Sequence, residues 1–245
     1  MQSRNLLLVG ASGGLGKCFA TELAKNAQYN LALHYHNHGE NIQKLEESLK
    51  QTGIKYKSYQ ADISKEQEVK SLIDSAEKDF GSIDILINNA GISIDSVSWK
   101  MSSEIWEEVI GVNLTGAFFC IKHVLPQMRK QNWGRIINIS SVVPQVGVAG
   151  TAAYSASKAG IFGLTRSIAK EIANKNITIN TIALGYFSEG MISQVPEELK
   201  KQIKNSIPKN EFGDPLDIVN CIRFLIDDNS SYITGQTINI NGGLY

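Results

Sequence analysis

The stretch LLLVGASGGLG at residues 6–16 decides how this chain folds. A short apolar run leads into glycines at positions 10, 13, 14 and 16, and a helix is expected to begin near Lys17. Glycine permits a tight turn and a close backbone approach to a ligand, while the N-terminus of the next helix offers N–H groups and partial positive charge to a pyrophosphate. The spacing G-x-x-x-G-x-G differs from the standard dinucleotide fingerprint G-x-G-x-x-G. This stretch therefore leaves two interpretations open, a nucleotide-binding loop and a tight structural turn.

The same alternation of a short apolar run and a longer periodic segment continues along the chain. Further strand candidates lie at residues 31–33, 56–60, 83–87, 135–139, 177–182 and 237–240. Runs that are apolar on both faces suit buried parallel strands, and the segments between them are long enough for crossover helices. We predict an α/β protein over residues 1–245, a single-domain Rossmann-type doubly wound fold with a central parallel sheet of about seven strands flanked by helices.

Composition and charge narrow the class of protein. The 245 residues are 42% apolar, which suffices for one core without disulfides or metals, and 24 Lys+Arg balance 24 Asp+Glu. A zero net charge gives no overall attraction to nucleic acid or anionic lipid. The cysteines Cys18, Cys120 and Cys221 are odd in number and far apart, which disfavours disulfides or a zinc site. With no signal-peptide core and no apolar run of about 18 residues, we expect a cytoplasmic protein without nucleic-acid or membrane partners.

Tyr154 and Lys158 form a second signal. On a helix, residues four apart project from one face, so the two side chains meet. A tyrosine has an ordinary pKa of about 10, and a neighbouring ammonium favours its phenolate form. The pair is therefore a candidate acid/base group. The alternative is an amphipathic helix with an incidental tyrosine and a surface lysine.

Other polar residues fall where ligands bind in open α/β sheets, beyond the carboxyl ends of the strands. Ser141 follows the fifth strand candidate, Asn89 follows the fourth, and Asp62 closes the third. Asn113 lies inside an otherwise apolar helical stretch, where an amide needs a hydrogen-bonding reason.

In this order, these elements resemble the short-chain dehydrogenase/reductase family from about residue 6 to residue 245. The resemblance implies a nicotinamide dinucleotide across the strand ends, with Tyr154 donating a proton to a carbonyl oxygen that Ser141 orients. It implies that Lys158 binds the ribose hydroxyls and lowers the pKa of Tyr154, and that Asn113 holds a water of a proton relay. Residues that it assigns to the dinucleotide are Gly10, Ser12, Gly13, Gly14, Leu15, Gly16, Tyr35, His36, Asp62, Ile63, Asn89, Gly91, Tyr154, Lys158 and Phe187.

Within that family, the chain is most similar to the 3-oxoacyl-[acyl-carrier-protein] reductases. The similarity lies in GRIINISSVV at 134–143, YSASKAG at 154–160, YITGQ at 232–236 and INGGLY at 240–245. It implies a homotetramer that reduces a 3-oxoacyl thioester with NADPH, in fatty-acid or related polyketide or polyene synthesis. Docking of the acyl carrier protein is expected near Arg129, Lys130 and Lys175. Two alternatives stay open, a reductase or dehydrogenase of a free small carbonyl or alcohol, and a catalytically weak dinucleotide-binding regulatory protein.

The end of the second strand bears on the choice of cofactor. Residues 34–38 read HYHNH and hold no carboxylate that would repel a 2′-phosphate, so NADPH is favoured over NADH. We interpret the three histidines as a polar loop and not as a metal site, because no acidic or cysteine ligand accompanies them. Against NADPH, Gly13 stands where many NADP-binding relatives carry a basic residue.

Three positions depart from the family pattern. Val9 replaces a threonine that precedes the first loop glycine, which removes a hydrogen bond expected to steady the loop. Leu184 replaces the proline of a Pro-Gly motif, and Glu189 stands where a threonine commonly meets the nicotinamide carboxamide. Residues 186–210 are predicted to form a lid over the site, with an ordinary surface excursion as the alternative.

Overall fold

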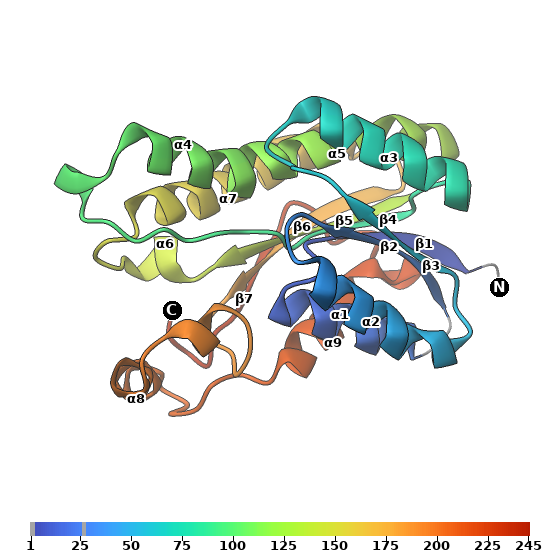
Figure 1. Cartoon of the computed structure of the whole chain (residues 1–245). Coiled ribbons are helices and arrows are strands. Elements are labelled where there is room, and N and C mark those ends of the chain that lie inside the picture. The colour runs from blue at the N-terminus through green and yellow to red at the C-terminus, as the bar shows by residue number, and fades with distance from the viewer. Residues whose placement is uncertain (1–2, 26–27) are drawn as a thin grey trace.

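The computed structural model describes residues 3–25 and 28–245, which form one parallel sheet between two layers of helices (Figure 1). The strand order is β3-β2-β1-β4-β5-β6-β7. The strands are β1 Arg4–Val9, β2 Tyr29–Tyr35, β3 Tyr56–Gln60, β4 Ile85–Asn88, β5 Gly134–Ser141, β6 Ile177–Leu184 and β7 Thr237–Ile240. All seven strand candidates and the predicted fold class are confirmed. The order reverses between β1 and β4, which opens a crevice beyond the carboxyl ends of these strands.

Burial on both faces explains the central strands. Every residue of β5 and of β6 is buried, and each strand is rich in isoleucine. Branched side chains fit a sheet that is covered on both sides. The two strands pair along their full length, from Gly134 opposite Ile177 to Ser141 opposite Leu184. This register sets Ser141 at the carboxyl edge of the sheet.

Helices cover the two faces of the sheet in separate groups. Helices α1, α2 and α9 enclose one core, and α3, α5 and α7 enclose the other (Figure 1). The helices are α1 Gly14–Ala24, α2 Gly39–Leu49, α3 Glu66–Phe80, α4 Ser103–Ile110, α5 Gly116–Gln131, α6 Val143–Val146, α7 Ala152–Ile172, α8 Glu197–Ser206 and α9 Pro215–Ile226. Short 3-10 turns lie at Lys50–Thr52, Ser98–Lys100, Met191–Gln194 and Asp228–Ser230.

Helix α1 begins three residues earlier than the sequence predicted. Gly13 has extended backbone angles, and its carbonyl accepts the N–H of Lys17 at 2.9 Å, the first bond of the helix. The helix therefore starts at Gly14, inside the glycine-rich loop. Because glycines are poor helix formers, sequence reasoning placed the start after them.

Helix α4, a π-helical turn at Gly111–Thr115 and helix α5 form a continuous rod over Ser103–Gln131. By length and composition this rod is apolar enough to cross a membrane, as its most apolar 18-residue window shows. Asn113 and Lys122 interrupt the apolar residues, which is why counting an unbroken run missed it. In the fold the rod packs on α3 and α7 as a core helix does, but only 39% of the window is buried.

Candidate active site

The carboxyl end of β5 and the first turns of α7 bring the predicted lysine and tyrosine together. Lys158 is buried, and its Nζ donates to the carbonyl of Ile139 at 2.9 Å. Ser140 Oγ donates to the carbonyl of Lys158, also at 2.9 Å, so the strand holds the helix at two points. Lys158 Nζ lies 5.9 Å from the centroid of the Tyr154 ring. The helical spacing inferred from the sequence is therefore confirmed.

The electrostatics of this pair differ from the expectation. Burial raises the pKa of Tyr154, and a hydrogen bond with Ser141 offsets part of the rise. The net direction is opposite to the lowering that we predicted from Lys158. Burial also lowers the pKa of Lys158 itself, to about 8, because a buried ammonium is poorly solvated. The tyrosine is thus held in its protonated form at neutral pH, the form that can donate a proton.

Ser141 occupies the last position of β5, directly before a turn. Its Oγ accepts the N–H of Val143 at 3.1 Å, which fixes the side chain at the start of α6. The same hydroxyl contacts Tyr154 through the hydrogen bond that affects its pKa. Ser141 and Tyr154 therefore face one space beyond the strand end, where one ligand oxygen can reach both hydroxyls.

Asn113 uses its whole amide to hold neighbouring segments. Its Oδ1 accepts the N–H of Ile92 at 2.8 Å, and its Nδ2 donates to the carbonyl of Ile92 at 2.9 Å and to Ser157 Oγ at 3.0 Å. These bonds tie the loop after β4 to helix α7. The hydrogen-bonding reason expected for this amide is present, but its side-chain atoms are committed to Ile92 and Ser157. Both hydrogens of Nδ2 are used, but Oδ1 can accept a second hydrogen bond, so the water-holding role of Asn113 stays a prediction. Sequence reasoning missed both partners, although Ser157 lies within the quoted stretch YSASKAG.

A chain of buried polar groups keeps α7 in register with the sheet. Asn88 Nδ2 donates to Asn138 Oδ1 at 2.9 Å, and Asn138 Nδ2 donates to Thr165 Oγ1 at the same distance. Thr165 and Thr181 hydroxyls lie 2.8 Å apart. The chain links β4, β5, α7 and β6, so the helix that carries Tyr154 cannot slide without breaking it.

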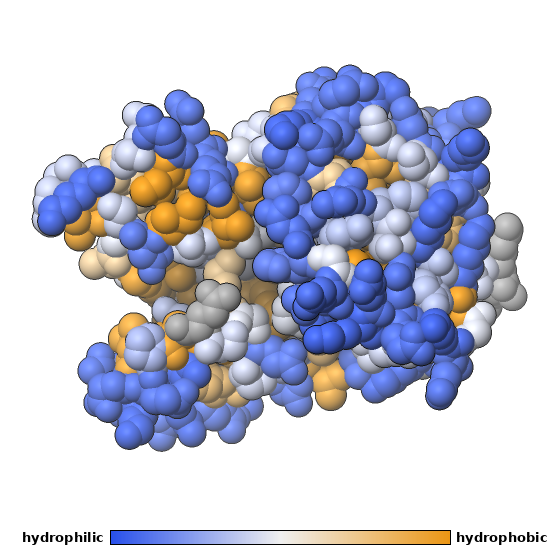
Figure 2. Space-filling view, in the orientation of Figure 1, coloured by the Kyte–Doolittle hydropathy of each residue, from blue (hydrophilic) through white to orange (hydrophobic). Residues whose placement is uncertain are grey.

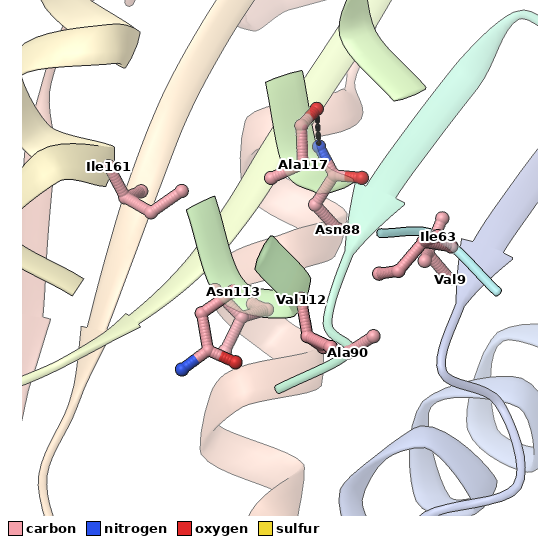
Figure 3. Close-up of a pocket in the computed structure, with 9 residues that line it drawn as sticks. Val9, Ile63, Asn88, Ala90, Val112, Asn113, Ala117 and Ile161 are labelled. Carbon is pink, nitrogen blue, oxygen red and sulfur yellow. Dashed lines mark hydrogen bonds between the residues drawn. The ribbon is translucent and has the colours of Figure 1, made fainter. Parts of the chain in front are cut away.

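A small cavity borders this polar chain (Figure 3). Its volume is about 10 Å³, and Val9, Asn88 and Asn113 are among its lining residues. Figure 3 shows the Asn88 amide oxygen directed toward the side where Val9 and Ile63 lie. That oxygen is buried and has no hydrogen-bond partner within residues 3–25 and 28–245. Val9, which pairs with Asn88 between β1 and β4, has no hydroxyl that could donate to this acceptor.

The glycine-rich loop has the shape of a ligand cradle. Gly10 has a φ of 82°, and a Cβ there would lie 2.8 Å from the backbone of Ala90. A Cβ on Gly16 would lie 2.1 Å from the carbonyl oxygen of Gly10. Asn89 Nδ2 donates to that same carbonyl at 3.0 Å and fixes the turn. The loop thus needs glycine at both positions, and it presents backbone at the N-terminus of α1, as a dinucleotide-binding loop does.

The ends of β2 and β3 form the other side of the crevice. His36, Asn37 and His38 are exposed, and Tyr35 is half-buried. The interpretation of His34 as part of a polar loop is wrong, because it lies within β2 and is buried. Its position in the sheet, between strands on both sides, overrides the polar character of the sequence around it.

Asp62 and Ile63 follow β3 at this edge. Asp62 Oδ1 accepts the backbone N–H of Ser64 at 3.0 Å and its hydroxyl at 2.6 Å. Burial alone would raise the pKa of Asp62, but these hydrogen bonds, together with Lys65 and the nearby His36, outweigh it and lower the pKa. Ile63 is buried beside Gly116. The predicted dinucleotide residues on β1, β2, β3 and β4 therefore lie along one edge of the sheet.

The predicted lid segment reaches the glycine-rich loop. It contains the 3-10 turn Met191–Gln194 and helix α8. Helix α8 stands apart from the main body across a cleft (Figure 2). A Cβ on Gly14 would lie 3.0 Å from the backbone nitrogen of Gly190, whose φ of 90° suits glycine. Glu189 is exposed next to this contact, and its charge adds to the effect of burial in raising the pKa of Cys18 on α1. Glu189 therefore acts electrostatically on the start of α1.

The remaining predicted positions lie on β6, directly after it, and on α5. Phe187 is buried against Gly213 and lines a cavity of about 250 Å³ beneath the lid segment. Leu184 ends β6 and is buried, so the missing proline leaves the strand intact. Arg129 and Lys130 lie in the last turn of α5. Since 16 residues of helix span about 24 Å, they lie at the opposite edge of the sheet from Asn113.

Comparisons with known proteins agree with this geometry. Residues 10–245 match the model of a family described as enoyl-(acyl carrier protein) reductase. The chain is 42% identical over 243 residues to the 3-oxoacyl-[acyl-carrier-protein] reductase FabG of Staphylococcus aureus, covering 99% of this chain and 98% of the relative. It is 38% identical over 245 residues to nodulation protein G of a Rhizobium species, covering 100% and 98%. To the FabG reductase of Aquifex aeolicus it is 37% identical over 246 residues, again covering 100% and 98%.

Proposed function

The chain belongs to the short-chain dehydrogenase/reductase family, and we propose that it reduces a 3-oxoacyl thioester on acyl carrier protein to the 3-hydroxyacyl thioester with NADPH. The observation that carries the proposal is the convergence of Ser141, Tyr154 and Lys158 at the carboxyl end of β5, beside a glycine cradle. The match to carrier-protein reductases along nearly the whole chain supports a thioester substrate in fatty-acid synthesis. The proposed location is the cytoplasm.

Each residue of the site has a defined task in this reaction. The protonated Tyr154 hydroxyl donates its proton to the substrate carbonyl oxygen as that oxygen gains negative charge. Ser141 donates a hydrogen bond to the same oxygen and keeps it in line with the tyrosine. Lys158 Nζ lies 5.9 Å from the centroid of the Tyr154 ring and beside Gly91, and it would donate hydrogen bonds to the ribose hydroxyls of a dinucleotide. When bound, the dinucleotide supplies the hydride.

NADPH is the proposed cofactor because of the exposed end of β2. His36, Asn37 and His38 offer hydrogen-bond donors and no carboxylate at this point. Asp62, the nearest carboxylate after β3, is occupied by Ser64. A 2′-phosphate therefore meets less repulsion here than in a site with an acidic residue at the end of β2.

We further propose a homotetramer in which the apolar rod contributes an interface. Trp106 and Phe118 are exposed on it, and most of its apolar window is not buried within one chain. Large exposed apolar surface of this kind is typical of an association site. If the two-fold axis is perpendicular to the rod, equivalent helices pair in antiparallel fashion, and Arg129 and Lys130 of one copy would approach the site of the other. This arrangement reconciles carrier docking there with the distance of about 24 Å along α5.

The test follows NADPH absorbance with an acetoacetyl thioester, a crotonyl thioester and a panel of simple ketones. We expect turnover of the acetoacetyl thioester to exceed that of each ketone, and no oxidation with the crotonyl thioester. Faster turnover of the crotonyl thioester would indicate enoyl reduction, the activity named by the matching family model. Turnover of ketones alone would favour the small-carbonyl alternative, and tight NADPH binding without turnover would favour a regulatory protein.

A further inference from the structure

His34 is a buried imidazole whose two nitrogens face backbone groups of different segments. It is 2% exposed, within β2. Nδ1 lies 3.1 Å from the backbone nitrogen of Gly10, the first glycine of the loop. Nε2 lies 2.9 Å from the carbonyl oxygen of Ala61, directly after β3. The ring therefore connects the glycine-rich loop to the end of β3.

The two partners fix the tautomer of the ring. A carbonyl oxygen only accepts, so Nε2 carries the hydrogen and donates to Ala61. A backbone N–H only donates, so Nδ1 is bare and accepts from Gly10. Burial lowers the pKa of His34 to about 4, which keeps the ring neutral throughout the physiological range. The acceptor that Gly10 needs is therefore present at any pH at which the protein works.

We propose that His34 is a positioning residue for the dinucleotide, holding the first turn of the glycine-rich loop through its Nδ1. The inference rests on the proposed function, since it assumes that this loop binds the dinucleotide. The backbone carbonyl of His34 also accepts the N–H of Ala11 at 2.8 Å, so one residue holds two successive loop amides. Asn89 holds the carbonyl of Gly10 from the other side. Gly10 is thus fixed between β2 and the loop after β4.

The hydrogen bond from Gly10 to His34 is important in this chain because Val9 replaces the threonine of the family pattern. Val9 has no side-chain hydrogen bond to offer, and the acceptor beside it, Asn88 Oδ1, is unsatisfied within the described part of the chain. Besides backbone bonds, the turn at Gly10 is therefore held by hydrogen bonds with the side chains of His34 and Asn89. Removing the Nδ1 acceptor would leave the N–H of Gly10 without a hydrogen-bond partner. The loop would then change its conformation and no longer present its backbone N–H groups to the dinucleotide.

Two variants of His34 separate the loop anchor from packing. In His34→Asn, the amide oxygen stands near the position of Nδ1 and still accepts from Gly10, while the bond to Ala61 is lost. In His34→Gln, the amide nitrogen stands near Nε2 and still donates to Ala61, while the bond to Gly10 is lost. Both variants replace the imidazole ring with an amide and lose one of its two hydrogen bonds. Both are therefore expected to lower the midpoint temperature of thermal unfolding. Only the glutamine variant removes the acceptor of the loop.

The first measurement is NADPH affinity of the full chain by fluorescence titration. We expect His34→Gln to weaken binding about 5- to 10-fold, the effect of one lost hydrogen bond, and His34→Asn to change it less than about 2-fold. The KM for NADPH should rise in His34→Gln while kcat at saturation is kept. Equal affinities in the two variants would overturn the proposal, because a role in packing alone affects both alike.

A second measurement does not depend on dinucleotide binding. Hydrogen exchange of residues 9–16 should be faster in His34→Gln than in His34→Asn, and equal exchange would overturn the anchor. If His34→Gln fails to fold, nitrogen NMR of the wild type decides, since a proton found on Nδ1 contradicts the anchor and one on Nε2 supports it. Failure of the proposed function is a different result, namely a wild-type chain that binds neither NADPH nor NADH.

Discussion

The catalytic centre and the glycine-rich loop are held in different ways. In the catalytic centre, the predicted side chains sit on regular elements and are fixed by hydrogen bonds, three of which involve the Asn113 amide. In the loop, backbone groups are fixed by side chains of neighbouring segments, such as His34 and Asn89. Of the three departures, Val9 and Glu189 lie around the loop and Leu184 pairs with Ser141 at the end of β6, but none falls on the catalytic side chains themselves.

This difference follows from what each region presents to a ligand. Proton donation needs a particular hydroxyl, so Tyr154 and Ser141 cannot be exchanged for other residues. A phosphate-binding loop presents N–H groups of the backbone, which any sequence supplies when the turn is held in shape. Neighbouring residues can therefore change where another anchor takes over. The catalytic centre should be intolerant of small chemical changes, and the loop should respond gradually.

Tyr154→Phe gives the sharpest test of the intolerant region. It removes one hydroxyl, and we expect turnover of the acetoacetyl thioester to fall about 10³-fold, in the range of a lost general acid. NADPH affinity should be unchanged, because the loop is not touched. Tyr59→Phe is the matched control, since its hydroxyl donates to Asp79 at 2.7 Å, away from the site. A Tyr154→Phe chain with near wild-type turnover would show that another group donates the proton.

Lys158→Met tests whether the catalytic centre is held at the expense of stability. Turnover should be lost, yet the free energy of unfolding at pH 7 should rise by roughly 1 kcal/mol, because a buried ammonium is replaced by an apolar side chain. The folded pKa of about 8 lies below the ordinary 10.5, so the unfolded wild type binds more protons between these values. Wild-type stability should therefore increase from pH 8 to 10.5, and the advantage of the variant should shrink.

Chemical unfolding across this pH range measures the effect. Lys170→Met, an exposed position on the same helix, is the control, and because it keeps Lys158 its stability should rise with pH as that of the wild type does. If Lys158→Met is less stable than the wild type at pH 7, the bond from Nζ to Ile139 outweighs the cost of burying the charge.

The sequence predicted the sheet and the catalytic centre because both follow local rules. Strands apolar on both faces, such as residues 135–139, must be covered on both sides. Tyr154 and Lys158 meet because the helix repeat brings residues four apart onto one face. The predicted start of α1 was wrong. The glycines before Lys17 disfavour a helix, yet in the structure the helix begins at Gly14 and includes Gly16.

Properties that arise from packing between distant segments could not be predicted in the same way. The direction of the Tyr154 pKa shift depends on burial by other elements, which no motif records. The role of His34 depends on Gly10 and Ala61, both more than twenty residues away. A signal was nevertheless present, since a histidine within the apolar run of β2 needs a hydrogen-bonding reason as much as Asn113 does.

Val9→Thr tests the tolerance of the loop region from the opposite direction. Val9 and Asn88 are paired residues of adjacent strands and line the same cavity. A threonine hydroxyl at position 9 can donate to Asn88 Oδ1, so we expect a gain of about 1 kcal/mol in the free energy of unfolding. Val69→Thr is the control, because Val69 is buried among apolar residues and the same change should destabilise the chain. If both variants lower the free energy of unfolding, a hydroxyl at position 9 does not reach Asn88 Oδ1, which would contradict this prediction.

Glu189→Gln should have the smallest effect, a change in NADPH affinity. It tests whether the lid segment behaves like the loop or like the catalytic centre. The Cβ of Glu189 lies 4.0 Å from the place of a Cβ on Gly14, at the start of α1, where the loop is proposed to hold the pyrophosphate. A carboxylate there repels phosphate, so the neutral amide should tighten NADPH binding about 2-fold at low salt. The gain should vanish near 1 M salt, where charges are screened within about 3 Å. Glu198→Gln on the exposed face of α8 is the matched control and should leave affinity unchanged. Weaker NADPH binding in Glu189→Gln would instead mean that the carboxylate helps to hold the cofactor. The lid would then resemble the catalytic centre, which does not tolerate small chemical changes.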